Sequence, residues 1–466
     1  MTEKKESRFK VPLKFNLAFA TGEITDAVAY QGFSFLIFTF YYAVIGIKVQ
    51  HVMIIYILWS IYNAFNDPIL GGFSDKTRTK RFGGGRRRPW MIIAWIPLSL
   101  IMFFLFTPFT TADTHPVWVA VYFFIIICLF DTIYTAFSLN RTSLYPEMFR
   151  TDKEREEAGA GRRIFMVLGL ILGMGVPTLF IPTLTESSQQ NIYNYWIAGA
   201  VLGVIVFVTA FINIKWGVKE PPVEELEKKE LYGVFQSIWY TLKNWKFVVF
   251  ILCSMMNWYV FALFPMIMPI YSEFVLLESR SMLVVLLLLV AFLSSAPGVV
   301  FWSFVDSKVG SKMGFVLSQA YWLAVLIPLF FVTNYWIALV LLALNGIGLA
   351  GSPYFIDRNI SNIADEDEQK TGQRREASYY GVHALVIRLS AIFAVVSVSS
   401  VLTRYGWSLF EPENVSVGLT TGLKALVSFF PATALAIGIV FLLMYPLNKK
   451  KVDELQTLYK KEIKQN

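Results

Sequence analysis

Residues 66–90 read NDPILGGFSDKTRTKRFGGGRRRPW and say the most about the fold. The segment begins at the end of one apolar run and finishes at the start of the next. It therefore places an acid, Asp67, just inside a predicted membrane span and a dense basic turn at the membrane surface. A charged side chain inside a membrane is costly and is kept mainly where it faces a cavity or a partner. The pattern indicates a tight cytoplasmic hinge between two spans.

Composition places the whole chain among helical membrane proteins. Of its 466 residues, 56% are hydrophobic and 16% are charged, whereas a typical soluble protein carries about 25% charged residues. Apolar stretches of about 20 residues, the length of a membrane-spanning helix, recur from end to end. A β-barrel would alternate apolar and polar residues instead. We therefore predict an all-α polytopic membrane protein.

We predict twelve transmembrane helices. They cover residues 15–45, 52–70, 89–110, 117–145, 161–184, 193–214, 246–275, 281–305, 314–333, 335–356, 377–403 and 420–446. Most Lys and Arg residues lie in segments that such a topology puts on one side of the membrane. Because positive charge marks the cytoplasmic side, we expect both termini to lie in the cytoplasm. We also expect a multi-pass protein of the plasma membrane.

The longest internal polar stretch separates six predicted spans from six. The predicted organisation is an N-terminal six-helix bundle over 1–214, a cytoplasmic linker with an amphipathic helix over 215–245, a C-terminal six-helix bundle over 246–446 and a basic cytoplasmic tail over 447–466. A weaker copy of the hinge, beginning at Asp306, follows the eighth span. This recurrence indicates two similar halves related by an axis along the membrane normal.

Several classes of function find no support in the sequence. The net charge is +8, but the basic residues sit in loops between spans and show no nucleic-acid-binding pattern. The two cysteines, Cys128 and Cys253, lie in apolar runs, and the three histidines are scattered, so no metal site is expected. No nucleophile motif is present either. We expect neither an enzyme nor a cofactor, and the expected partners are the lipid bilayer, a small-molecule substrate and a coupling cation.

Acidic and polar residues within the first-half spans are the main candidates for chemistry. Glu23 and Asp26 lie three residues apart on span one, and Tyr30 follows one turn later on the same face. Span two holds Asn63 and Asp67, one turn apart. Span four holds two more candidates, Asp131 near its middle and Thr135 one turn on.

Basic residues on other spans could balance these acids. Arg163 opens span five, and span eleven holds His383 and Arg388. If the groups converge on one cavity, binding of a proton or another cation changes the local charge and favours one orientation of the halves. Asp67 could instead pair with a loop arginine for purely architectural reasons, and His383 could be a buried imidazole bonded to a neighbour.

The charges of the hinge and of its second copy have a simpler interpretation. We expect them to set the topology and to latch the cytoplasmic ends of the helices together. These gating candidates are Asp75, Arg78, Arg86 and Asp306.

Four motifs resemble those of one transporter family. They are the NDP hinge with its Gly-rich basic loop and RPW, SLYP at 143–146, DKERE at 152–156 and TGQRREASY at 371–379. Together they are similar to the glycoside–pentoside–hexuronide:cation symporters, the melibiose-permease branch of the major facilitator superfamily. The resemblance runs over nearly the whole chain. It implies two six-helix bundles, alternating access around a central cavity and a monomer.

The resemblance also implies roles for individual residues. The family's sodium-binding acidic pair on span two falls at Asn63, a departure, and at Asp67. A sugar-binding acid of span four falls at Ser138, and that of span one falls between Glu23 and Asp26. Three further family positions also have counterparts here. The span-five arginine matches Arg163, the span-eleven lysine matches Arg388, and a glutamine one turn earlier matches His383.

We therefore predict cation-coupled symport, with H+ or Na+, of a small polar solute that is a sugar or glycoside. The predicted substrate-binding residues are Glu23, Asp26, Tyr30, Arg163, His383 and Arg388. The predicted cation-binding residues are Asn63, Asp67, Asp131 and Thr135. An alternative is transport of a lysophospholipid or another amphipathic lipid, with Arg388 or Arg163 holding the phosphate. A membrane enzyme or receptor is a third, less supported reading, because no catalytic motif or sensor domain is visible.

Overall fold

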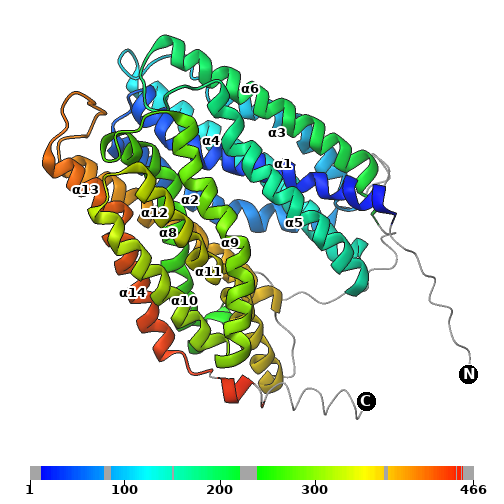
Figure 1. The fold of residues 1–466 in the computed structure, drawn as a ribbon. Helices are drawn as coiled ribbons and strands as arrows, with labels where there is room; N and C mark the ends of the chain where they lie inside the picture. Colours follow the sequence, from blue (N-terminus) through cyan, green and yellow to red (C-terminus); the bar gives the residue numbers. More distant parts are fainter. Residues whose placement is uncertain are drawn as a thin grey trace, which may run out of the picture.

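The computed structural model describes residues 12–77, 85–149, 152–220, 239–371, 376–447, 449–452 and 454 (Figure 1). The described helices, in chain order, are α1 (Leu13–Thr39), α2 (Val49–Lys76), α3 (Arg88–Phe104), α4 (Pro116–Met148), α5 (Asp152–Gly175), α6 (Gln189–Ile212), α8 (Trp245–Phe274), α9 (Ser281–Val309), α10 (Ser311–Leu326), α11 (Tyr335–Thr371), α12 (Glu376–Arg404), α13 (Val417–Val427) and α14 (Phe429–Met444). Shorter turns extend four of them: Phe40–Val44 and Asn213–Gly217 are π-helical, and Val176–Leu179 and Ile327–Phe331 are 3-10 helices.

Ten of the described helical segments are long and apolar enough to cross a membrane. Of the other two passes, α3 is apolar but only 17 residues long, and α2 carries the polar residues of the hinge. With α13 and α14 counted as one pass broken at Ser428, the described helices make twelve passes. The predicted all-α polytopic fold is confirmed.

Several helices extend beyond the predicted spans. α11 was expected to end near residue 356 and continues to Thr371, and α2 covers Val49–Lys76 instead of 52–70. The added turns of α11 are charged and held by ion pairs: Glu366 contacts Lys370 one turn on and Lys246 of α8. Such turns are stable outside an apolar layer. Most of the predicted amphipathic linker helix falls on 221–238, outside the described residues.

The helices form two groups, which we call the N-terminal group (α1–α6) and the C-terminal group (α8–α14). Figure 1 shows the groups diverging toward the end where α1 begins and α14 finishes. Along the boundary α2 packs against α12, α1 against α8, and α5 against α9. The predicted division of the chain into two bundles, a linker and a tail stays a prediction, although the N-terminal and C-terminal groups are compatible with it.

The two groups are joined at the opposite end, which we call the sealed end. There the backbone N–H of Val49 donates to Ser408 O over 2.8 Å, and that of Ser281 donates to Pro182 O over 2.9 Å. The hydroxyl of Tyr42 donates to Trp407 O over 2.6 Å. These bonds link the end of the π-helical extension of α1 and the start of α2 to the connection after α12, and the connection after α5 to the start of α9.

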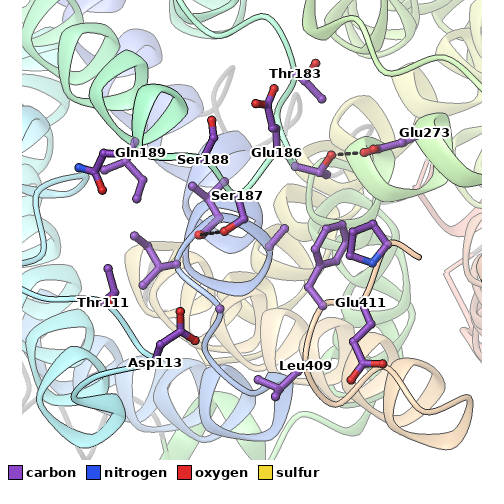
Figure 2. Close-up of a pocket in the computed structure, with 18 of the residues that line it drawn as sticks. Thr111, Asp113, Thr183, Glu186, Ser187, Ser188, Gln189, Glu273, Leu409 and Glu411 are labelled. Carbon is purple, nitrogen blue, oxygen red and sulfur yellow. Dashed lines mark hydrogen bonds between the residues drawn. The ribbon is translucent and has the colours of Figure 1, made fainter. Parts of the chain in front are cut away.

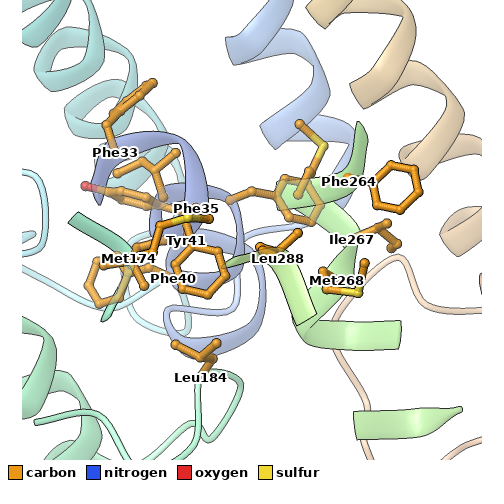
Figure 3. Close-up of a cluster of buried hydrophobic side chains, with 14 of the residues drawn as sticks. Phe33, Phe35, Phe40, Tyr41, Met174, Leu184, Phe264, Ile267, Met268 and Leu288 are labelled. Atoms are coloured by element: carbon orange, nitrogen blue, oxygen red, sulfur yellow. The ribbon is translucent and has the colours of Figure 1, made fainter. Parts of the chain in front are cut away.

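An apolar core continues across the same boundary. Figure 3 shows Phe40 and Tyr41 of the N-terminal group on one side and Phe264, Ile267 and Leu288 of the C-terminal group on the other. These side chains are at most 8% exposed. Bonds and apolar packing together hold the groups closed at the sealed end.

Candidate functional site

Asp67 lies on α2 where the N-terminal group meets the C-terminal group. Its Oδ1 accepts a hydrogen bond from Thr135 Oγ1 of α4 over 2.8 Å. Its Oδ2 accepts one from the Arg388 guanidinium of α12 over 2.7 Å. Both side chains are about a quarter exposed, so the ion pair is partly accessible. Asp67 therefore ties together helices of both groups.

A second carboxylate, Asp131 on α4, lies in the same region and is only 3% exposed. Asn63 Nδ2 donates to its Oδ1 over 2.9 Å, and Asn66 Nδ2 donates to its Oδ2 over 3.2 Å. Asn63 Oδ1 is buried without a hydrogen-bond partner. A buried acceptor left unpaired costs free energy, so Asn63 Oδ1 can accept a further polar contact beside Asp131.

Helical spacing explains why these five side chains meet. Residues three and four apart share a helix face, which groups Asn63, Asn66 and Asp67 on α2 and Asp131 with Thr135 on α4. The two faces pack against each other. We call the set Asn63, Asn66, Asp67, Asp131 and Thr135 the α2–α4 cluster. All four predicted cation-binding residues belong to it.

The charge and atom types of the α2–α4 cluster suit a small cation. It offers carboxylate, amide and hydroxyl oxygens, the ligands that hard cations prefer. With both carboxylates ionised, Arg388 balances one of the two charges. One uncompensated negative charge remains, which a single monovalent cation or a proton can neutralise.

The two predicted α1 acids form a separate ionic cluster around Arg141 of α4. The Arg141 side chain is 2% exposed. Its Nε donates to Asp26 Oδ2 over 2.8 Å, and its NH1 donates to Glu23 Oε1 over 3.0 Å. Arg162 of α5 also contacts Glu23. Gly22 makes room for this arrangement, since a Cβ there would lie 2.5 Å from Arg141 Cδ.

The surroundings of the predicted substrate residues therefore differ from residue to residue. Glu23 and Asp26 are engaged by arginine, so the structure does not present them as free carboxylates. Arg163 is exposed on α5, and its neighbour Arg162 joins the ionic cluster instead. Tyr30 is 40% exposed, and its ring lies 5.9 Å from that of Tyr134.

His383 of α12 is buried within the C-terminal group. Its Nε2 lies 2.7 Å from Ser254 Oγ of α8. Among the described contacts, this bond does not connect His383 to either ionic cluster. Arg388, five residues later, reaches the α2–α4 cluster instead, and the role of His383 in substrate binding stays a prediction.

The predicted gating residues make contacts inside one group each. Asp306 of α9 binds Arg358 of α11 over 2.5 Å and accepts a hydrogen bond from Tyr354 over 3.0 Å. The backbone N–H of Arg86 donates to Glu220, which follows α6, over 2.7 Å. The Asp75 side chain and all of Arg78 lie outside the described residues.

Sequence reasoning missed Arg141, Arg162 and Asn66 as members of the polar clusters. A signal for Arg141 exists in the sequence, because Asp131, Ser138 and Arg141 follow one another at helical spacings on a single face of α4. No comparable spacing distinguishes Arg162 from Arg163, because these adjacent residues differ only in the direction in which α5 points their side chains.

Comparison with known proteins gives one family and several distant relatives. The family model described as MFS/sugar transport protein matches residues 18–449. The sodium-dependent lysophosphatidylcholine symporter 1 of Gallus gallus is 21% identical over 486 residues, which cover 97% of this chain and 90% of that protein. An uncharacterized symporter of Synechocystis is 26% identical over 236 residues, which cover 50% of this chain and 43% of that protein.

A solved structure shows the same fold. The crystal structure of the nucleoside transporter NupG has a TM-score of 0.66 and 14% sequence identity, covering 93% of this chain and 99% of that chain. At this identity the likeness concerns the arrangement of helices alone.

Proposed function

The chain belongs to the MFS/sugar transport protein family, and we propose that it is a cation-coupled symporter that moves a small organic solute by alternating access. H+ or Na+ is the coupling ion. The proposal places a monomer in the plasma membrane with both termini in the cytoplasm. It leaves the narrower assignment to the melibiose-permease branch as a prediction.

One observation carries the proposal: the ion pair between Asp67 and Arg388 crosses the boundary between the two groups. Asp67, a predicted cation-binding residue, and Arg388, a predicted substrate-binding residue, are thus bound to each other. A cation that binds Asp67 competes directly with Arg388. Binding at the α2–α4 cluster can therefore change both the charge of the solute site and the contact between the moving halves.

Coupling then follows from competition for Asp67. Before the cation arrives, Asp67 holds Arg388. A bound cation takes the place of Arg388 at Asp67 and frees the guanidinium for the solute. Because a ligand shifts a conformational equilibrium only by its differential affinity for the two states, loss of a bond that spans the halves supplies such a difference. Cation and solute together favour reorientation.

The first substrate class is a sugar or glycoside. The ionic cluster disfavours a neutral sugar within this class. Glu23 and Asp26 already bind Arg141, which leaves few free carboxylates to bind the hydroxyl groups of such a sugar. Arg388 suits a carboxylate, which a guanidinium binds with two parallel hydrogen bonds. An acidic sugar such as a hexuronate offers a carboxylate to Arg388 and depends less on free carboxylates of the protein.

An amphipathic lipid phosphate is the second substrate class. Arg388 suits a phosphate as well as a carboxylate. A relative that aligns with 97% of this chain is named as a lysophosphatidylcholine symporter. Both substrate classes use the same cation site and differ in the solute alone.

The test is uptake by purified protein in proteoliposomes under an imposed sodium gradient and, separately, a proton gradient. The panel contains a neutral glycoside, a hexuronate and lysophosphatidylcholine. Gradient-driven accumulation of the glycoside or hexuronate supports the first class, and gradient-driven movement of the lysolipid supports the second. Equal uptake with and without both gradients, for every solute that is moved, contradicts cation coupling.

A further inference from the structure

A cavity of about 670 Å³ lies at the sealed end, between connections from both groups. Figure 2 shows Thr111 and Asp113 from the connection after α3 and Ser187 from the connection after α5. From the C-terminal group it shows Glu273 at the end of α8 and Glu411 after α12. The cavity is therefore divided between the two halves that separate when the sealed end opens.

The charged residues among the described lining are all acids: Asp113, Glu186, Glu273 and Glu411. The adjacent Arg280 does not balance them, because Glu278 binds its guanidinium over 2.6 and 2.7 Å within the same loop. Closing the sealed end thus brings carboxylates of one half toward carboxylates of the other.

Glu273 is the acid that takes part in the bonds between the two groups at the sealed end, which we call the seam. Thr185, in the connection after α5, donates a hydrogen bond to Glu273 Oε2, shown as a dashed line in Figure 2. Thr185 is 2% exposed. The neighbouring Ser281–Pro182 backbone bond belongs to the same seam. Glu186 follows Thr185 directly, so the bond holds Glu273 close to a like charge.

We propose that Glu273 is a proton-responsive gating residue that favours the closed sealed end when it is protonated. An ionised carboxylate loses hydration and meets Glu186 when the seam closes, and both effects disfavour closure. A neutral carboxyl group avoids both costs and still bonds to Thr185. Acidic conditions at this end therefore shift the population toward the sealed conformation.

This inference goes beyond the proposed function, because it depends on neither the solute nor the coupling ion. Under the predicted orientation, the sealed end faces the outside. External acidity then favours the conformation that is open toward the cytoplasm, independently of Asp67 and Asp131.

The test measures the distance across the sealed end in the full-length protein without solute. Spin labels go on cysteines replacing Phe109 and Val417, which are 87% and 84% exposed on opposite groups, after Cys128 and Cys253 are replaced by alanine. Pulsed electron paramagnetic resonance gives the fraction of molecules with the short distance. In the otherwise unaltered protein this fraction rises as the pH is lowered, because a carboxyl group that is disfavoured in its charged form takes up a proton more readily.

Variants separate Glu273 from other titrating groups. Glu273→Gln is neutral at every pH, so its short-distance fraction stays high and loses most of the pH response. Thr185→Val removes the donor and leaves the charge, so its short-distance fraction at pH 8 falls below that of the parent. Glu413→Gln, an equal charge loss at an exposed position outside the cavity, behaves as the parent. A Glu273→Gln protein with the parent's full pH response overturns the proposal, as does an unchanged Thr185→Val.

Discussion

The Arg388 guanidinium lies 2.7 Å from the Asp67 carboxylate, across the boundary between two groups of helices that otherwise bond to each other, in the described residues, at the sealed end. A charge pair at this place links occupancy of the α2–α4 cluster to the relative position of the halves.

The first prediction concerns the position of the second acid. Asp131→Asn removes the buried charge of the α2–α4 cluster, so gradient-driven accumulation should be lost while the protein still inserts and folds. The double variant Asn63→Asp/Asp131→Asn returns the acid to the facing position on α2, 2.9 Å away in the hydrogen-bonded pair. Accumulation should recover at least in part. If the double variant is as inactive as Asp131→Asn, the carboxylate functions only from its position on α4.

A second prediction compares two arginines. Arg388→Ala should raise the apparent KM for the solute at least tenfold, a loss of about 1.4 kcal/mol or more, in the range for a hydrogen bond to a charged group. Arg163→Ala should change it little, because Arg163 is exposed on α5. Initial uptake rates over a range of solute concentrations give both values. Equal effects of the two substitutions argue that Arg388 has only a structural role.

Stability should depend strongly on Arg141. Arg141→Met leaves Glu23 and Asp26 as buried acids without their shared partner, and removing one member of a buried ion pair typically costs about 3–5 kcal/mol. The thermal unfolding midpoint of the purified protein should fall well below that of the parent. Arg404→Met, at an exposed position near the end of α12, is the matched control and should leave the midpoint almost unchanged. A small effect of Arg141→Met contradicts the ionic cluster.

The fourth prediction concerns the cap of α3. Glu220 accepts hydrogen bonds from the backbone N–H groups of Arg86, Arg87 and Arg88 over 2.7–3.1 Å. Gly85 has a φ of +111°, and a Cβ there would lie 2.2 Å from Glu220 Oε2. Gly85→Ala should therefore expel the carboxylate and cost roughly 1–2 kcal/mol, the scale of a lost N-cap.

The same contact gives a test of additivity. Glu220→Ala should destabilise by a similar amount, and the double variant should be no worse than the more damaging single one, because both remove one interaction. Thermal unfolding of the three variants is sufficient. Fully additive losses indicate that Gly85 and Glu220 act separately.

Much of the fold was predictable from the sequence because each long apolar run has one low-cost solution in a bilayer, a helix. The α2–α4 cluster was predictable in part for a similar reason. Asp67, Asp131 and Thr135 are polar residues at helical spacing inside apolar runs, and each needs a partner at that depth.

Contacts between distant helices were not predictable in the same way. Arg141 shares a face of α4 with Asp131, but only the packing of α1 against α4 shows that it binds Glu23 and Asp26. The Glu273–Thr185 contact joins residues 88 positions apart, one at the end of α8 and the other in the connection after α5, and no helical spacing relates them. Helix ends were also misjudged where charged turns, as in α11, continue beyond the apolar part.

The most direct test of cation coupling is solute accumulation by the protein and by Asp67→Asn in matched proteoliposomes, under a sodium gradient and then a proton gradient. Glu413→Gln, at an exposed position in the connection after α12 and outside the sealed-end cavity, serves as the control. We predict that at least one gradient concentrates the solute in the parent and the control, whereas neither gradient does so in Asp67→Asn. Accumulation by Asp67→Asn to the parent level contradicts the central claim.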